Sequence, residues 1–271
     1  MKNKVQLVGH YGSDKVIACS AWTSTSRDLT EEKLARIGAL VNMLWSEGHE
    51  TPFEKGEVHF LVNTDIASHI HLLKHRISSL NAESARYKEL KEDKYYVPKD
   101  WGEIESTAYI ADDFPTAFVE PHDEWVDILI KYTNLGNELY HQCIKDLEPL
   151  LGRKRAKESA RFFKTYNSQI QADVKFNMRS FANFLKLRNS ESAQLEIREI
   201  AKEMLKQVSE IHGDPFKHTL EAFEKRSNLE KTTKSLVKKM GDPDGAAHCI
   251  DMVLESPEIF DQIKDGWFSN L

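Results

Sequence analysis

The sequence predicts an α+β fold in which a mixed sheet is packed with long helices and the second half of the chain is rich in helix. Alternating apolar residues near the N-terminus indicate strands, and apolar stripes at the helical period dominate after residue 123. Strands and helices do not alternate regularly, which argues against a doubly wound parallel sheet. With 271 residues, 40% of them hydrophobic, the chain can bury a substantial core.

The first quarter of the chain predicts strands followed by a helix. Residues 5–22 mix short apolar runs with glycines, which is typical of one or two strands with a turn at residues 11–14. Thr30 is expected to cap a helix that ends near Gly48, where a left-handed C-terminal cap belongs. The apolar positions of this helix are Leu34, Ile37, Val41 and Leu44.

A strand and a second helix come next. Residues 57–63 alternate in polarity and predict a mostly buried strand. Asp65 is expected to cap a helix over residues 66–76, and residues 81–86 are interpreted as a loop. One face of the helix is apolar and comprises Ile66, Ile70 and Leu73.

The second half of the chain begins with an irregular connection over residues 91–122, which are polar, aromatic and interrupted by three prolines. A long helix is predicted from Asp123, then helices over 179–187 and 192–211, and a helical segment from Asp214. The first of these helices has the apolar stripe Trp125, Ile128, Leu129, Tyr132, Leu135 and Leu139. The helix over 192–211 has Ile197, Ala201, Met204 and Val208 on its inner face.

The overall charge and the cysteines exclude several classes of protein. A formal net charge of -6 argues against a nucleic-acid coat or a polybasic membrane binder. No stretch approaches the roughly 18 consecutive apolar residues of a membrane span, and the first residues lack a signal-peptide core. Cys19, Cys143 and Cys249 form no Cys-x-x-Cys pair, so neither a zinc site nor a disulfide framework is indicated. We expect a cytoplasmic protein with no metal, nucleic-acid partner or membrane.

The densest cluster of chemically active residues is Lys74-His75-Arg76, followed after seven residues by Ser84, Ala85, Arg86 and Tyr87. Guanidinium groups bind phosphate oxygens, and a Ser-Ala turn can complete an anion site with its backbone N–H groups. The cluster could therefore hold a nucleotide phosphate. The alternative is a solvated helix end whose cations complement the helix dipole.

Two further strings carry polar residues. Residues 48–54 read Gly-His-Glu-Thr-Pro-Phe-Glu, in which His49 could also be an ordinary capping residue. Residues 177–188 place Arg179 and Asn183 on one helix face, with Phe184 and Leu187 expected to anchor the helix. An ordinary amphipathic helix is the alternative for this string.

The third string continues through Ala193-Gln194 and Glu196-Ile197-Arg198. In their order along the chain, over residues 48–198, the three strings resemble the signature of flavin-dependent thymidylate synthases. That family has Arg-His-Arg, seven residues and Ser, together with Gly-His-Glu-Ser/Thr-Pro-Phe-Glu and Asn-Phe-Leu-x-Leu-Arg. Lys74 stands where the family has its first Arg, and further departures are Lys55 for His, His71 for Gln and Ala82 for an acidic residue. Ala160-Arg161 matches an Ala-Arg of the family, although Lys164-Thr165 replaces the Leu-Pro that follows it there.

The resemblance implies the fold of that family over residues 1–212, a catalytic domain, with residues 213–271 as a helical C-terminal extension. It also implies FAD as cofactor, NADPH and methylenetetrahydrofolate as co-substrates, dUMP as substrate, and a homotetramer with intersubunit active sites. The flavin would be held by Thr51, Lys74, His75, Arg76, Asn177, Arg179 and Asn183, with His49 on the folate or flavin side. The nucleotide would be held by His71, Ser84, Ala85, Arg86, Arg161 and Arg188.

Within this resemblance Arg188 is the expected catalytic residue, because it would stabilise negative charge that develops on the pyrimidine. The cysteines lie outside all three strings, so no thiolate nucleophile is expected. Two alternatives remain open. One is a flavin-dependent C5-methylase or hydroxymethylase of another pyrimidine nucleotide, and the other is a noncatalytic nucleotide-binding relative.

Overall fold

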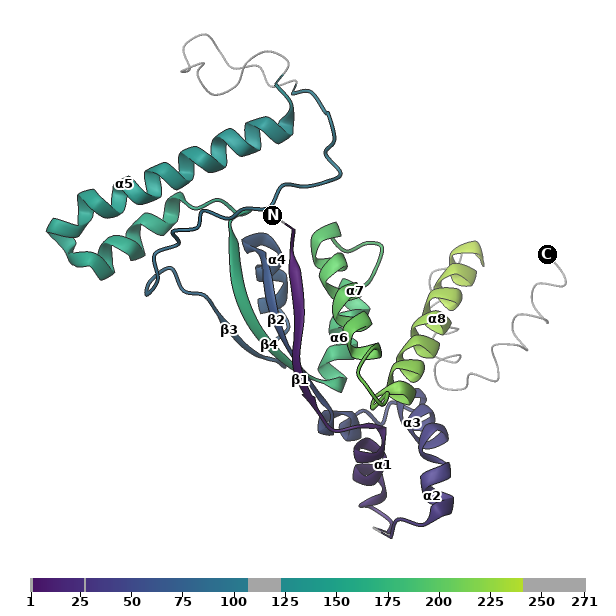
Figure 1. Ribbon diagram of the computed structural model, residues 1–271. Coiled ribbons are helices and arrows are strands. Elements are labelled where there is room, and N and C mark those ends of the chain that lie inside the picture. The colour runs from purple at the N-terminus through teal and green to yellow at the C-terminus, as the bar shows by residue number, and fades with distance from the viewer. Residues whose placement is uncertain (1, 27, 107–122, 241–271) are drawn as a thin grey trace. The chain divides into compact units, whose positions relative to one another are not determined.

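The computed structural model describes residues 2–26, 28–106 and 123–240, with side chains described up to residue 231 (Figure 1). The chain divides into two compact units. The first unit comprises the residues up to Val8 together with His59–Lys175 and Gln194–Ile200. The second unit comprises Gly9–Val58, Phe176–Ala193 and the residues from Ala201 onward.

A four-stranded antiparallel sheet has the order β1-β2-β4-β3. Its strands are β1 (Lys4–Tyr11), β2 (Glu57–Asp65), β4 (Gln169–Asn177) and β3 (Ser79–Ala82). Ser79 lies opposite Lys175 in the register of β3 and β4. The predicted α+β class is confirmed, although the sheet is antiparallel where a mixed sheet was expected. β3 also occupies part of the predicted loop over residues 81–86. The strand was not predicted because its pairing with β4 leaves no local sequence signal in so short a segment.

Strand β2 and helix α4 (Ile66–Leu73) follow one another as predicted. Alternate residues of β2 are buried, and the Asp65 carboxylate accepts a hydrogen bond from the Ser68 amide at 2.8 Å, which caps the helix. The helix ends three residues before the predicted end, and its buried face differs from the prediction. It buries Ser68, His69 and Leu72, whereas Leu73 is 52% exposed, so apolar character alone did not identify the buried face.

Helix α5 (Trp125–Ala160) turns back on itself, as Figure 1 shows, and leads into the short 3-10 helix η2 (Arg161–Phe163). The reversal lies at Gly152, whose φ of 75° and ψ of 153° are essentially restricted to glycine. Gly136 is needed for a different reason, because a Cβ atom there would come within 2.6 Å of the Phe163 carbonyl oxygen.

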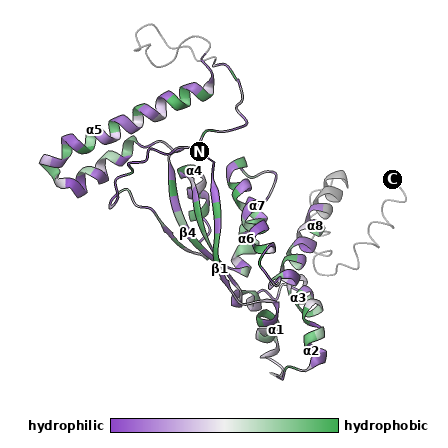
Figure 2. Ribbon diagram, in the orientation of Figure 1, coloured by the Kyte–Doolittle hydropathy of each residue, from purple (hydrophilic) through white to green (hydrophobic). Residues whose placement is uncertain are grey.

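The predicted apolar stripe of α5 faces largely outward within the described residues. Ile128 is buried, but four of the six residues are between 40% and 55% exposed, namely Trp125, Tyr132, Leu135 and Leu139. Figure 2 shows hydrophobic and hydrophilic residues interspersed along the ribbon of α5. The helix buries a different row that includes Thr133, Gly136, Asn137, Tyr140 and Ile144. The face that α5 buries against its own unit is therefore this neighbouring row, and most of the predicted apolar stripe lies outside it.

In the second unit, α1 (Asp14–Trp22) replaces the second strand predicted within residues 5–22. Ser13 caps α1 by accepting a bond from the Val16 amide, so a local polar contact starts a helix in an apolar run too short to show a period. The predicted helix after Thr30 is present as α2 (Glu31–Ala35) and α3 (Ile37–Ser46), with a break at Arg36. Thr30 is confirmed as the N-cap and Gly48 has the predicted positive φ.

Three later helices complete the described structure: α6 (Met178–Arg188), α7 (Leu195–Ser209) and α8 (Lys217–Met240). The four predicted inner residues of α7 are all buried. In the second unit the Asp14 carboxylate accepts bonds from the amides of His218 and Thr219, and so caps the first turn of α8. Of the predicted connection over 91–122, residues 107–122 lie outside the described residues, as do residues 241–271 of the predicted C-terminal extension.

Candidate functional site

The sequence-predicted site residues fall in both units, and each group has its own geometry. In the first unit the end of α4 presents Lys74, His75 and Arg76 in succession. Lys74 and Arg76 are exposed and form no ion pair with any described residue, while His75 is buried. Two uncompensated cations beside a buried imidazole suit an anionic ligand.

Unpartnered polar atoms accumulate on α4 just before this cluster. His71 contacts the Gln194 amide oxygen through Nε2 at 3.2 Å, but its Nδ1 is buried and has no partner among the described residues. The same holds for Nδ1 of His69 and Oγ of Ser68, and burial lowers the pKa of His69. A buried polar atom without a partner costs free energy, so these atoms suit contact with polar groups of a ligand.

The Ser84–Arg86 segment forms a tight turn after β3. The Ser84 hydroxyl accepts a bond from the Arg86 amide at 3.3 Å, and its carbonyl oxygen accepts bonds from the amides of Tyr87 and Lys88. Ala85 lies half-buried inside this turn. The turn fixes the backbone from which the Arg86 side chain extends.

Arg86 donates from Nε to Glu158 at 2.7 Å. This bond lowers the pKa of Glu158 and raises that of Arg86. Glu158 lies one turn before Arg161, which is exposed and has no ion-pair partner among the described residues. The structure thus brings two of the predicted phosphate-binding arginines to one end of α5.

In the second unit, the residues after α3 meet the start of α6. Arg179 donates from Nε to Glu50 at 2.9 Å and from Nη1 to Glu54 at 2.7 Å. The bonds that Arg179 donates to Glu54 and Glu50 raise the pKa of its guanidinium. His49 and Thr51 flank Glu50, and both are exposed. Two strings that are more than 120 residues apart in sequence are therefore joined by these ion pairs.

Helix α6 carries the remaining predicted residues. Asn177 is its N-cap, with the side-chain oxygen accepting a bond from the Ser180 amide at 2.8 Å. Asn183 is exposed, like Arg179 one turn earlier, and Arg188 is the half-buried last residue of the helix. Phe184 anchors α6 as predicted, but Leu187 is 50% exposed and does not.

The carboxylate partners of Arg86 and Arg179, and the amide that contacts His71, were not predicted from the sequence. Glu50 and Glu54 stood inside a string that had been singled out, so their position gave a usable signal. Glu158 gave none, because its role depends on which turns of distant helices come together. Gln194 stood in the continuation of the third string, but its contact with His71 was not predicted. Within the described residues no group of three or more histidine, cysteine or acidic side chains could hold a metal ion, and none of the described helices is long and apolar enough to span a membrane.

The described residues place the chain among α+β proteins that have one antiparallel sheet and several helices. The three strings occur along this chain in the order that the family signature has. The family model described as thymidylate synthase complementing protein matches residues 6–213. The chain belongs to this family, as the resemblance had indicated.

Two curated relatives are named flavin-dependent thymidylate synthase. The chain is 29% identical over 243 residues to the protein of Anaplasma marginale, a match that covers 88% of this chain and 79% of the relative. It is 31% identical over 197 residues to the protein of Pseudothermotoga lettingae, covering 73% and 80%. Among solved structures, it resembles a UMP/dUMP methylase PolB from Streptomyces cacaoi bound with 5-Br dUMP, at 24% identity and a TM-score of 0.63. That match covers 82% of this chain and 95% of the other, and at this identity it supports the fold alone.

Proposed function

We propose that this protein is a flavin-dependent thymidylate synthase, which converts dUMP to dTMP with FAD as cofactor and methylenetetrahydrofolate and NADPH as co-substrates. The observation that carries the proposal is the match to relatives of that name over most of both chains. The three strings within residues 48–198 support it independently, because each supplies charged or polar groups suited to one part of the reaction.

The donor set of the chain fits a flavin dinucleotide. Lys74 and Arg76 have no acidic partner among the described residues, so they can pair with the two phosphates without breaking an existing ion pair. In this proposal His75 and the residues Thr51, Asn177, Arg179 and Asn183 complete the flavin contacts, with His49 on the folate or flavin side. A bound flavin supplies the reducing hydride.

The dUMP phosphate is assigned to Ser84, Ala85, Arg86 and Arg161. Arg86 now pairs with Glu158, and its guanidinium would exchange this carboxylate for the phosphate. The Arg86 side chain is 45% exposed, so a phosphate can reach its guanidinium, and the Glu158 carboxylate, which is 16% exposed, would keep its contact with Arg155. His71, with its unpartnered buried Nδ1, is assigned to the nucleotide as well.

Arg188 is assigned the activating role. Uracil C5 is a weak nucleophile, and a guanidinium beside N3 and O4 would stabilise negative charge on that side of the ring, which enriches the electron density at C5 for its attack. Arg188 needs only to hold its charge in place and moves no proton. Its position as the last residue of α6, after the buried Phe184, fixes its backbone on a packed helix.

We also propose a homotetramer with active sites shared between subunits. The outward-facing apolar row of α5, comprising Trp125, Tyr132, Leu135 and Leu139, supports this proposal, because contiguous exposed apolar surface commonly marks an interface. Residues 1–212 are proposed as the catalytic domain and 213–271 as a helical extension, whose described part includes α8.

A second candidate is a C5-methylase of another pyrimidine nucleotide, because His71 and Ala82 differ from the residues the family usually has near its nucleotide. The test is to purify the protein, record its visible spectrum, and supply methylenetetrahydrofolate and NADPH with dUMP, UMP or dCMP in parallel. Mass spectrometry of the products should give dTMP from dUMP. A methylated product from UMP or dCMP alone would favour the second candidate, and tight dUMP binding without any product would indicate a noncatalytic relative.

A further inference from the structure

A cavity of about 300 Å³ in the first unit is lined by an excess of lysines. It lies where the start of β1, the end of β2, the start of β4 and the segment 83–94 meet. Six lysines line it against three carboxylates, although the whole chain carries a net charge of -6. The lysines are Lys2, Lys4, Lys88, Lys91, Lys94 and Lys164, and the carboxylates are Glu83, Glu92 and Asp93.

Each of the three carboxylates already has a lysine partner. Glu83 pairs with Lys88 at 2.6 Å, Asp93 pairs with Lys164 at 2.6 Å, and Glu92 pairs with Lys94. The other three lysines, Lys2, Lys4 and Lys91, are exposed and form no ion pair with any described residue. The cavity therefore presents three uncompensated positive charges from two separate parts of the chain.

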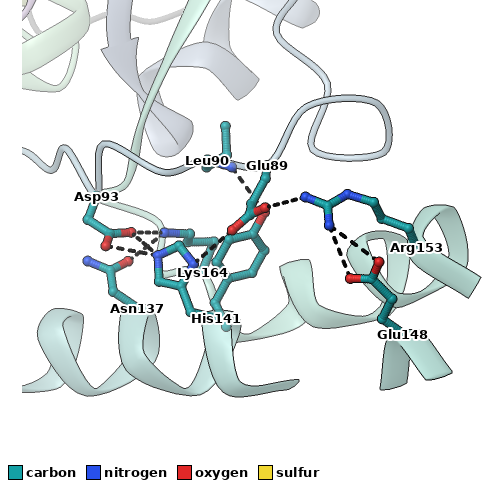
Figure 3. A network of polar contacts seen from close by, with 9 residues as sticks. Glu89, Leu90, Asp93, Asn137, His141, Glu148, Arg153 and Lys164 are labelled. Atoms are coloured by element: carbon teal, nitrogen blue, oxygen red, sulfur yellow. Dashed lines mark hydrogen bonds and ion pairs between the residues drawn. The ribbon is translucent and has the colours of Figure 1, made fainter. Parts of the chain in front are cut away.

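The segment that carries Lys91 is held firmly against α5 (Figure 3). Asp93 accepts bonds from Lys164 and from His141, and Lys164, which is 4% exposed, also donates to Asn137 at 2.7 Å. Burial acts to raise the pKa of Asp93, but the bonds from Lys164 and His141 outweigh it and the pKa is lowered. Asp93 therefore stays ionised at neutral pH, and its bonds to Lys164 and His141 hold the backbone next to Lys91.

Glu89 extends the same network on the other side of Lys91. Oε1 of Glu89 lies 3.4 Å from Nδ1 of His141, and its Oε2 lies 3.1 Å from Nη2 of Arg153. The hydroxyl oxygen of Tyr140 accepts a bond from the Leu90 amide. The Lys91 backbone is thus anchored on both sides, so its charge is presented at a defined place rather than on a free loop.

The residue types decide which anion fits. No arginine is among the lining residues, so the planar fork that grips a single phosphate or carboxylate is missing from the described wall of the cavity. Lysines act as separate point charges on flexible stems, which suits a flexible chain with its negative charges spaced along it. Glu83 in the lining directly precedes Ser84, so the cavity adjoins the segment to which the nucleotide was assigned.

We propose that this cavity binds the oligo-γ-glutamyl chain of a polyglutamylated folate co-substrate. The proposal rests on the proposed function, because only a folate-dependent reaction brings such a chain to the protein. The pteridine end would react beside the nucleotide, and the carboxylates of the tail would meet Lys2, Lys4 and Lys91. The interaction is between solvent-exposed charges, so it weakens as salt is added.

The test compares mono- and pentaglutamyl methylenetetrahydrofolate on the full chain and on the triple variant Lys2→Gln, Lys4→Gln, Lys91→Gln. Three exposed charge contacts, each worth a factor of about three, should together lower KM for the pentaglutamyl form by roughly 10- to 30-fold relative to the monoglutamyl form in the parent. The triple variant should lose this preference while turning over the monoglutamyl form normally. A matched control replaces three exposed lysines outside the cavity by Gln: Lys15, Lys145 and Lys202.

Binding of free γ-pentaglutamate, measured by calorimetry at low salt, gives a readout that does not depend on turnover. Binding that is lost in the triple variant and kept in the control supports the proposal, even if no thymidylate is formed and the proposed function fails. Equal KM values for both folates and no pentaglutamate binding by the parent would overturn it. A rise in KM for NADPH alone in the triple variant would also overturn it, because it would assign the lysines to the phosphates of the nicotinamide cofactor.

Discussion

Asn177 is proposed to have two roles that substitution can separate. Its side-chain oxygen caps α6 by accepting a bond from the Ser180 amide at 2.8 Å, and its side-chain NH₂ group is available for the flavin. Asn177→Asp keeps the capping oxygen and removes the donor. Asn177→Ala removes both, so the pair of variants distinguishes a structural role from a binding role.

The magnitudes follow from these contacts. Asn177→Ala should lower the free energy of unfolding by about 1 kcal/mol through loss of the cap. Asn177→Asp should change it by no more than about 0.5 kcal/mol, since Asp caps as well as Asn and its charge is favourable at a helix N-terminus. Losing the donor and adding a negative charge should cost about 1–2 kcal/mol of flavin binding, which raises Kd roughly 5- to 30-fold.

The assay combines urea denaturation with a flavin titration followed by visible absorbance. Both variants should bind flavin weakly, while only Asn177→Ala loses stability. If Asn177→Asp bound flavin as tightly as the parent with its stability intact, the Asn177 amide would not contact the flavin. Asn177 would then be a capping residue and nothing more.

Three other predictions concern separate parts of the chain. Arg188→Ala should slow single-turnover oxidation of the reduced flavin at saturating dUMP by about 100- to 1000-fold, with the flavin still bound. Lys186 is an exposed cation on the same helix, and Lys186→Ala should react at nearly the parent rate. Equal rates for both variants would show that Arg188 takes no part in the reaction. Gly152→Ala should lower the free energy of unfolding by about 1–3 kcal/mol, because a Cβ atom there meets no neighbour within 4 Å and the cost is backbone strain; a loss below about 0.5 kcal/mol in urea would contradict this. Burial raises the pKa of Asp14 above its ordinary 3.8, so its contribution to stability is full below that pH and is lost as the pH rises through the raised pKa. The stability of the parent minus that of Asp14→Asn should therefore decline as the pH rises above 3.8, and a difference that grows over this range would refute the assignment.

The sequence predicted those parts of the fold that depend on local contacts. Thr30 and Asp65 cap helices because each side chain bonds an amide three residues ahead, and such contacts can be read from neighbouring residues. The inner face of α7 was also predicted correctly, because its apolar residues repeat over four turns. A long, regular pattern of apolar residues identifies which face of a helix is buried.

The predictions from sequence failed where contacts between distant residues determine which element forms or which face is buried. Residues 14–22 are an apolar run too short to distinguish a strand from a helix, and the structure makes it α1. The outer row of α5 is as apolar as a core face, and only the contacts of its neighbouring row show which side its own unit covers. Local sequence contains no record of either contact.

The candidate site shows the same division. Three strings identified the cations and, for Arg179, also its partners Glu50 and Glu54, but the partner of Arg86 lies outside the strings. Glu158 and Gln194 contact Arg86 and His71 only because distant turns come together, and the lysine-lined cavity joins Lys2 and Lys4 to a segment almost ninety residues later. Such convergence of unremarkable charges cannot be seen before the chain is folded.

The central claim is that the chain methylates dUMP by a flavin route that needs no enzyme thiolate. Cys19 and Cys143 are half-buried free thiols, and Cys249 lies outside the described residues. The most direct test replaces all three cysteines by Ser and measures, by mass spectrometry, the product formed from dUMP, methylenetetrahydrofolate and NADPH with FAD bound. We predict dTMP at close to the parent rate, and none when the flavin is removed. A folded, flavin-loaded variant that binds dUMP but forms no dTMP, while the parent does, would contradict the account.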